Sequence, residues 1–208
     1  MPPADSQLKP DPAEVTRQQI LLHAKDLFTY FGFNKTNIGD IADRCGMSPG
    51  NLYRYYRNKQ AIGVAVTETY FRSVEAAMGT PLLLPEGTAE QRIRAFVLAG
   101  IKHLADELAR NPKVVELAEF ICADEEGRKI LQFHIDWKHA QLVAELTKGM
   151  TSGELARADA DEAAGAILCA LKAFWLPMTL ALWHEPDRVF PDLDAILDLM
   201  FRGLRAPA

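Results

Sequence analysis

Residues 41–56 read Ile41-Ala-Asp-Arg-Cys-Gly-Met-Ser-Pro-Gly-Asn-Leu-Tyr-Arg-Tyr-Tyr56, a pattern that predicts two short helices joined by a tight turn. Gly46 is the residue most easily placed at positive φ, so the first helix can end there and the chain can turn. Ser48 and Pro49 then provide a side-chain cap and a residue with helical φ. The second helix has Leu52 as its single aliphatic residue, so it is suited to presenting side chains rather than burying them. This arrangement is a helix-turn-helix.

Charge is distributed unevenly along the 208-residue chain, whose formal net charge is −5. The segment 35–59 carries five basic residues and two acidic ones, so its net charge is +3 and that of the remainder is −8. A basic patch on an acidic protein is typical of a sequence-specific DNA reader with a separate body. An ordinary solvated surface has the same charge pattern, so charge alone does not separate the two interpretations.

Helices are predicted on both sides of this stretch. Residues 11–14 form a helix start signal, and apolar residues then recur at three- and four-residue steps up to Gly32. Asn37 begins the helix before the turn, and Asn58 begins a longer helix that ends near Met78. These helices are long enough to share one small core. Its candidate residues are Phe28, Phe31, Ile41, Leu52 and Tyr56.

The two adjacent tyrosines are expected to differ in exposure. Tyr56 follows Leu52 by four residues and therefore shares its helical face, which predicts that Tyr56 is buried. Tyr55 is then expected outside.

Many residues of this region occupy set positions relative to one another. They are Ala24-x-x-Leu27-Phe28, Phe31-Gly32-Phe33, Thr36, Ile38, Ile41-Ala42, Cys45-Gly46-Met47-Ser48, Gly50-x-Leu52-Tyr53-x-Tyr55-Tyr56 and Lys59. This pattern closely resembles the amino-terminal domain of the TetR family of transcriptional repressors, over about residues 15 to 65. The resemblance implies a segment that binds double-stranded DNA.

Nine DNA-binding residues are expected. By position in the family motif, Pro49, Gly50 and Tyr53 are implied to meet base edges, and Asn37, Asn51, Tyr55 and Lys59 to meet phosphates. The full set is Asn37, Ser48, Pro49, Gly50, Asn51, Tyr53, Arg54, Tyr55 and Lys59.

The phosphate contact of Lys59 and the choice of base-reading residues also follow from physical arguments that do not use the family motif. Lys59 lies in a first helical turn, where the helix dipole disfavours a cation, so a bound phosphate would remove the penalty. Gly39 and Gly50 present no side chain to the bases. Sequence preference is therefore expected to rest on Tyr53, Arg54 and Asn51.

The rest of the chain predicts an all-α body, with about nine helices overall and no strand pattern. Helices are expected from about 88 to 109, 112 to 123, 124 to 149 and 160 to 183, the last kinked at Pro177, and a final one opens at Pro191. The predicted domains are a disordered tail at 1–12, a helix-turn-helix domain at 13–73, and a ligand-binding and dimerisation domain at 74–208.

The body is expected to pair with a second copy and to hold a ligand. The helix from 160 is apolar nearly all round, which suits either a dimer interface or the centre of the body. The interface residues proposed are Leu168, Leu171, Trp175, Leu182, Ile196 and Met200. The family resemblance implies a small, largely apolar effector, although each candidate also suits an ordinary core position. These candidates are Phe96, His103, Phe120, Phe133, His134, Trp137, Phe174 and Met178.

Several other classes of protein are not favoured. No nucleophile elbow, phosphate-binding loop or complete metal-ligand set is present, so no enzyme, metal or cofactor is predicted. Cys45, Cys122 and Cys169 lie among apolar neighbours and are expected to be buried, reduced thiols. No signal peptide or membrane span is seen, which predicts a cytoplasmic protein.

The sequence therefore predicts a homodimeric repressor that binds a near-palindromic DNA operator and is released by a small-molecule effector. The alternative is a TetR-like co-activator or protein-binding module that does not bind an operator. The effector, the operator sequence and the regulated genes are not readable from the sequence.

Overall fold

In the computed structural model, which describes residues 11–83, 87–181 and 186–205, the chain is all-α, and these residues contain no β-strand. The predicted fold class is thus confirmed, with ten α-helices in the described residues rather than about nine. They are α1 (Pro12–Phe31), α2 (Ile38–Arg44), α3 (Pro49–Leu52), α4 (Lys59–Gly79), α5 (Ala89–Arg110), α6 (Val114–Ala123), α7 (Glu125–Ser152), α8 (Ala160–Ala170), α9 (Pro177–Ala181) and α10 (Pro186–Leu204). Two short 3₁₀ helices, Thr80–Leu83 and Lys172–Trp175, lie between α4 and α5 and between α8 and α9.

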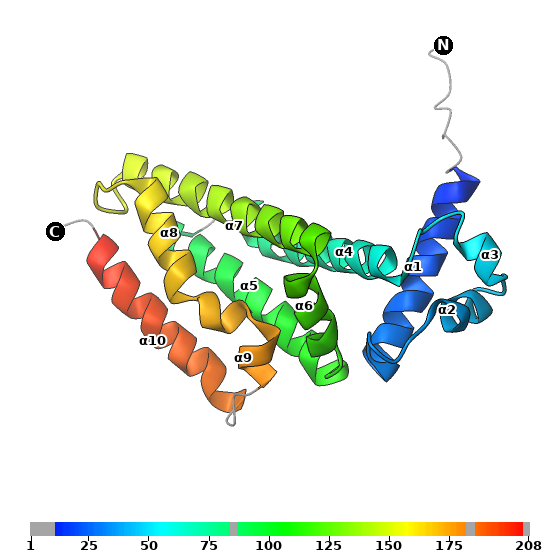
Figure 1. Ribbon diagram of the computed structural model, residues 1–208. Coiled ribbons are helices and arrows are strands. Elements are labelled where there is room, and N and C mark those ends of the chain that lie inside the picture. Colours follow the sequence, from blue (N-terminus) through cyan, green and yellow to red (C-terminus); the bar gives the residue numbers. More distant parts are fainter. Residues whose placement is uncertain (1–10, 84–86, 182–185, 206–208) are drawn as a thin grey trace, which may run out of the picture.

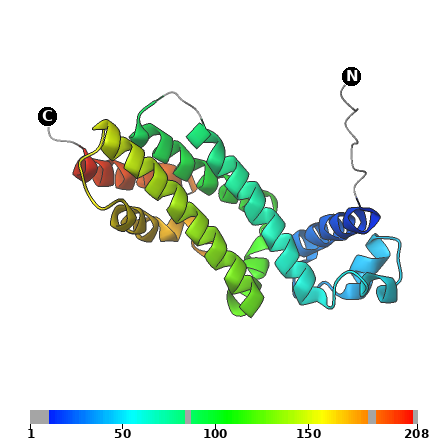
Figure 2. The same cartoon turned by 90° about the horizontal axis from the view of Figure 1, so that it is seen from above.

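The molecule is elongated, with α1, α2 and α3 grouped at one end (Figure 1). Helix α4 leaves this group and runs into the body, where it packs along α5 and α7 (Figure 2). Each end of the molecule has its own buried cluster of apolar side chains. The predicted tail falls mostly on residues 1–10, which lie outside the described residues, and α1 begins at Pro12, capped by Asp11.

The core of the amino-terminal group largely follows the sequence pattern. Phe28, Ile41 and Leu52 are buried there. Phe31 was predicted to join them but is 51% exposed, because the chain turns at Gly32, where φ is 95°, and Phe33 enters the core instead. The predicted difference between the tyrosines is also wrong, since Tyr55 and Tyr56 are both half-buried against this core.

Capping residues set most helix starts where the sequence predicted them. Asn37 and Asp40 form a reciprocal capping box on α2, and Thr88 forms one with Gln91 on α5. Asp159 likewise caps α8 through its carboxylate. These caps are local in sequence, which is why they are readable without the structure.

The predicted helix from 160 to 183 is interrupted. Helix α8 ends at Ala170, a 3₁₀ turn follows, and Leu176 is extended at φ −100° and ψ 118° before Pro177 begins α9. A residue before proline avoids the helical region, so the chain breaks there rather than kinking. The last helix starts at Pro186 and contains Pro191, which corrects the predicted start.

The cysteine prediction is also wrong for two of the three residues. Cys122 and Cys169 are exposed, and Cys45 is of intermediate exposure. Apolar neighbours in sequence did not bury them, because a helix turns each successive residue to a different side. No helix among the described residues is long and apolar enough to cross a membrane.

Candidate nucleic-acid interface and ligand cavity

The turn between α2 and α3 has the geometry that the sequence predicts. Gly46 has a φ of 66°, which the absence of a Cβ permits. Ser48 then caps α3, its Oγ accepting a hydrogen bond from the Asn51 amide at 3.2 Å. Leu52 is fully buried and anchors this helix on α1 and α2. The short helix is thus held by one apolar residue and one cap.

The predicted DNA-contacting residues lie mostly on the surface. Tyr53 is 53% exposed, whereas Asn51, Tyr55 and Lys59 are half-buried. The remaining five are exposed: Asn37, Ser48, Pro49, Gly50 and Arg54. In both caps on this face the side-chain oxygen accepts from the backbone, which leaves the Nδ2 donors of Asn37 and the hydroxyl proton of Ser48 unused by the capping bond.

Lys59 has a structural role that the sequence argument missed. Its Nζ donates to the Phe33 carbonyl at 2.8 Å and to the Thr36 carbonyl at 3.0 Å. The ammonium also lies 4.5 Å from the centroid of the Phe33 ring, and partial burial lowers its pKa. These carbonyls offset the unfavourable helix dipole within the protein itself. The position of Lys59 in a first helical turn is therefore explained by the fold, and its predicted contact with a phosphate stays a prediction.

A shallow hollow on this face collects residues from three segments of the chain. The turn after α1 and the start of α2 form one wall, α3 with Tyr53 forms the second, and the start of α4 forms the third. The residues around it are Asn34, Lys35, Thr36, Asn37, Ile38, Gly39, Pro49, Tyr53, Arg57, Asn58, Lys59 and Gln60. Lys35 and Arg57 are exposed cations here that the motif did not assign. Their signal in the sequence was the basic charge of segment 35–59.

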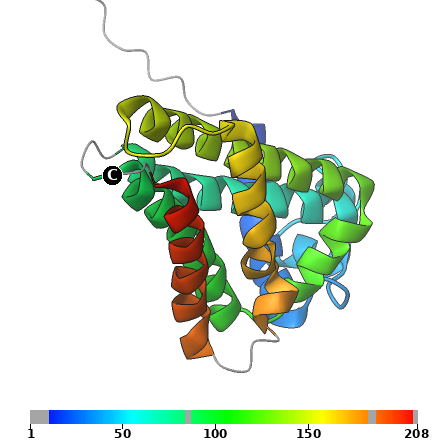
Figure 3. The same ribbon diagram turned by 90° about the vertical axis from the view of Figure 1, so that its left-hand side faces the viewer.

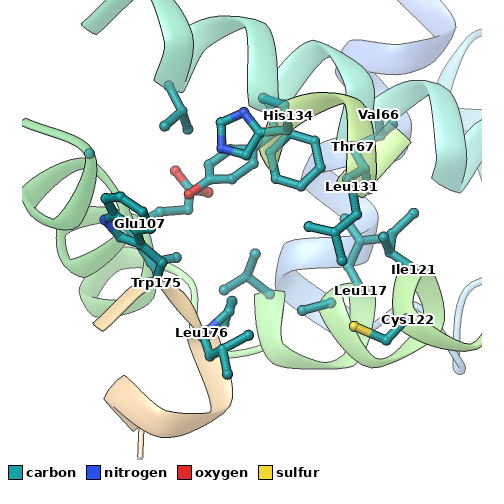
Figure 4. Close-up of a pocket in the computed structure, with 18 of the residues that line it drawn as sticks. Val66, Thr67, Glu107, Leu117, Ile121, Cys122, Leu131, His134, Trp175 and Leu176 are labelled. Atoms are coloured by element: carbon teal, nitrogen blue, oxygen red, sulfur yellow. The ribbon is translucent and has the colours of Figure 1, made fainter. Parts of the chain in front are cut away.

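A second concavity, of about 120 Å³, lies inside the body. It is lined by residues from α1, α4, α5, α6, α7 and the segment 175–177. Figure 4 shows Glu107 and Trp175 on one side of its open centre, with Leu131 and Ile121 on the opposite side. A mostly apolar cavity with a few convergent polar groups has the character of a small-molecule site.

Only one of the eight predicted ligand residues, His134, lines this cavity. Phe96 and Phe174 are buried in the body core instead. Phe133 and Met178 are 69% and 40% exposed. The remaining three, His103, Phe120 and Trp137, are partly buried beside other helices but do not line it. Whether a residue lines the cavity depends on how its helix is oriented against the other helices that surround the cavity. Residue type alone does not give that orientation.

Glu107 is a buried carboxylate that the sequence did not select, and it has several partners. It is 4% exposed and accepts from Asn111 Nδ2 at 3.0 Å and from Arg110 at 3.3 Å. The Nζ atom of Lys25 in α1 lies 3.7 Å from Glu107 Oε1 and forms an ion pair with it. Its charge is therefore balanced within the protein.

Lys138 is a buried cation in the same cavity with a different environment. It is 6% exposed, and its Nζ lies 4.0 Å from the centroid of the Trp175 ring. Burial lowers the pKa of Lys138 to about 8, although the Glu75 carboxylate raises it somewhat. Within the described residues its ammonium makes no hydrogen bond and no ion pair.

His134 lies one helical turn before Lys138 and is neutral. Burial, with the Lys138 charge as a second cause, lowers the pKa of His134 to about 3. Its Nδ1 lies 2.9 Å from Glu75 Oε1, so we assign the tautomer in which Nδ1–H donates to that carboxylate. The ring is stacked on Phe71 with centroids 4.4 Å apart. His134 thus shapes the wall without adding charge.

The predicted dimer residues are divided by the structure. Leu171 is fully buried in its own core and Trp175 lines the cavity, so neither is available to a partner. Leu168, Ile196 and Met200 are half-buried, and Leu182 lies outside the described residues. Leu199, 71% exposed, was missed. Helices α8 and α10 lie on the same side of the body (Figure 3).

The fold, a helix-turn-helix unit joined to a separate helical body, defines a class of two-domain helical proteins. Two family models match this chain. The model for bacterial regulatory proteins of the tetR family matches residues 20–66, and the model for the tetracyclin repressor-like C-terminal domain matches residues 89–196. The second match covers more than half of the chain. The protein belongs to the TetR family.

Individual relatives agree with this assignment. The HTH-type transcriptional repressor NemR of Escherichia coli (strain K12) is 27% identical over 81 residues, which are 39% of this chain and 41% of NemR. The match thus spans about two fifths of that relative. The TetR-family regulator PfmR from Thermus thermophilus is 25% identical, with a TM-score of 0.62 over 88% of this chain and 97% of that one. A TetR-family regulator from Mesorhizobium loti MAFF303099 has a TM-score of 0.76 at 17% identity, over 94% and 100% of the two chains, and shares the fold.

Proposed function

We propose that the protein is a homodimeric transcriptional repressor that a small molecule releases from its DNA operator. One observation carries this proposal: a single helix, α4, connects the exposed face of the helix-turn-helix with the wall of a buried apolar cavity. Lys59 at its start belongs to the first site, and Val66, Tyr70 and Val74 belong to the second. A ligand that changes the position of α4 therefore changes the position of the recognition helix.

Helix α6 provides a second connection between the two sites. Leu117 and Ile121 line the cavity. From the same helix, Phe120 stacks on Phe33 with ring centroids 4.1 Å apart, and Glu116 accepts a hydrogen bond from the Asn34 amide at 3.4 Å. The segment 33–36, held in turn by Lys59, thus moves with α6. Release requires only that the ligand prefer the arrangement that does not bind DNA.

Two copies are needed because one recognition helix makes too few contacts, and successive major grooves of one DNA face lie about 34 Å apart. The surface of α8 and α10 supports an isologous four-helix interface. Small or apolar exposed residues on these two helices are Ala166, Cys169, Ala170, Ala195, Leu199 and Gly203, and they alternate with exposed charged residues such as Glu162 and Asp194. The name of the relative NemR, a transcriptional repressor, supports the direction of regulation proposed here.

A mobility-shift assay with the DNA that flanks the protein's own gene tests the proposal. We expect a saturable shift that random DNA of equal length does not give. Tyr53→Ala should lose more affinity on the flanking DNA than on random DNA, because Tyr53 is the exposed aromatic residue of the recognition segment. A protein that shifts neither DNA would favour the co-activator or protein-binding alternative.

A further inference from the structure

The cavity in the body contains a buried ammonium, that of Lys138, to which no described residue gives a direct hydrogen bond or ion pair. Among its lining residues, Lys25, Lys138 and Glu107 carry charge, and His134 is neutral. Lys25 and Glu107 form an ion pair with each other. Lys138 remains, without a hydrogen bond or ion pair in the described part of the chain. A buried ammonium in this condition is costly unless something else supplies an acceptor.

The groups around Lys138 explain why the protein itself does not supply that acceptor. The Trp175 ring covers one side of the ammonium at 4.0 Å. Glu75, the carboxylate whose charge acts on it most, uses Oε1 to accept from His134. Glu107, the carboxylate among the described lining residues, is occupied by Asn111, Arg110 and Lys25. The open direction from Lys138 is the cavity, which this side chain lines.

From this geometry we propose that the effector is a small apolar carboxylate whose anionic group pairs with Lys138 while its hydrocarbon part fills the apolar cavity. The hydrocarbon part would contact the aliphatic wall formed by Leu104, Leu117, Ile121 and Leu131. This inference rests on the proposed effector site and names the chemistry of its ligand. A charge-assisted hydrogen bond in a site with little water is the strong kind, so the pairing contributes both affinity and orientation.

The same charges select against other ligand classes. A cationic ligand would meet Lys138 as a like charge, and Glu107, the carboxylate among the described lining residues, already has its partners. A neutral amide of equal shape offers the ammonium a carbonyl acceptor but no opposite charge, and a plain hydrocarbon offers neither. Specificity would therefore come partly from repulsion and partly from a buried donor that only an acceptor can satisfy.

Benzoate, benzamide and benzamidinium form a test series of nearly equal shape and of charge −1, 0 and +1. These one-ring compounds suit the cavity, which is comparable to cavities that hold a single benzene ring. 2-Naphthoate and 2-naphthamide extend the series to a larger ring system and test the size limit. Calorimetric titration of the full chain without DNA measures binding directly. We expect a carboxylate to bind about tenfold or more tightly than its amide, with benzamidinium weakest.

Lys138→Met keeps the shape of the side chain and removes the charge. We expect it to abolish the preference for carboxylate over amide while leaving amide affinity unchanged. Lys129→Met is the matched control, since Lys129 is an exposed lysine of the same helix that pairs with Glu125 and Glu126. Because removal of an unpaired buried charge is not expected to unfold the protein, the melting temperature of Lys138→Met should be at or above that of the wild type.

The proposal is overturned if the amide or the amidinium binds as well as the carboxylate. It is equally overturned if Lys138→Met keeps the preference, or if neither carboxylate binds at millimolar concentration. These outcomes are separate from failure of the proposed function. Carboxylate binding by a protein that shifts no DNA would contradict the proposed repressor function and support the assigned ligand chemistry. DNA binding that is released only by uncharged ligands would support the repressor function and contradict the assigned ligand chemistry.

Discussion

Two basic residues, one just before α4 and one at its first position, differ in what they contact, and this difference is testable by single substitutions. Lys59 donates to two carbonyls, whereas Arg57 is exposed on the same hollow. We expect Lys59→Met to lower the free energy of unfolding by about 1–3 kcal/mol, because both hydrogen bonds to the charged group are lost. Chemical denaturation followed by circular dichroism measures this loss.

Arg57→Met is the comparison for that experiment. It should leave stability within about 0.5 kcal/mol of the wild type, because no core contact is removed. It should weaken binding to all DNA sequences and reduce the slope of log affinity against log salt by about 1. An unchanged salt slope in Arg57→Met, or unchanged stability in Lys59→Met, would contradict the division of roles.

The buried Lys138 predicts a particular dependence of stability on pH. Its pKa is lowered from 10.5 to about 8, mainly by burial, so between these values the unfolded chain binds a proton that the folded chain does not. The contribution of Lys138 to the free energy of unfolding therefore rises with pH through this window, by up to about 3 kcal/mol. Below pH 8 the charged side chain costs stability in the fold.

Lys138→Met removes this titration, so the variant isolates it from every other group. We expect the variant to exceed the wild type in stability at pH 7 and the difference to shrink as the pH approaches 10.5. Urea denaturation of both proteins across this range measures the difference. A difference that stays constant with pH would show that Lys138 is not strained by burial.

At the scale of the helix, α4 packs closely against two aromatic rings at Gly63. A Cβ built there would lie 2.7 Å from the Phe33 ring and 2.9 Å from the Phe120 ring. Gly63→Ala should therefore destabilise the protein by about 1–3 kcal/mol, because the stacked rings that join α6 to the amino-terminal domain must separate. Gly79→Ala, at the other end of α4, should be neutral or slightly stabilising, because a Cβ added there would meet no described atom within 4 Å outside the adjoining backbone of the helix. Equal thermal stability of the two variants would contradict this contact.

Helices were predictable from sequence where the determining signal is local. The caps at Asn37, Thr88 and Asp159 satisfy backbone amides two or three residues away, and each begins a helix as predicted. The break at Leu176 was missed because apolar periodicity continues through it, and that periodicity reflects burial on several sides rather than a continuous helix. Exposure of Phe31 likewise depends on how the chain turns at Gly32.

Whole-molecule packing explains why the cavity was not predictable. Its lining comes from α1, from α4 through α7 and from the segment 175–177, so membership depends on how these helices lie against one another. Glu107 and Lys138 read as ordinary surface charges in an amphipathic pattern, yet both are buried. The helix-turn-helix surface was more predictable, because three short local segments build it and its motif has fixed spacing.

The assembly of two copies is expected to depend on the surface of α8 and α10. Leu199→Glu places a charge at the most exposed apolar residue of that surface and should shift the protein to monomer, with DNA affinity falling by about tenfold or more. Leu22→Glu, at a 60% exposed leucine of α1, is the control and should stay dimeric. Sedimentation equilibrium distinguishes these outcomes, and a dimeric Leu199→Glu protein would place the interface elsewhere.

The coupling between the cavity and the DNA-binding face is tested most directly by release of bound DNA. Fluorescence anisotropy of labelled flanking DNA, titrated with the more tightly bound of benzoate and 2-naphthoate, measures release for the wild type and for Lys138→Met in parallel. We expect the wild type to leave the DNA as the carboxylate is added, while Lys138→Met stays bound over the same range. A wild type that stays on the DNA with its cavity occupied, or equal release of both proteins, would contradict coupling through Lys138.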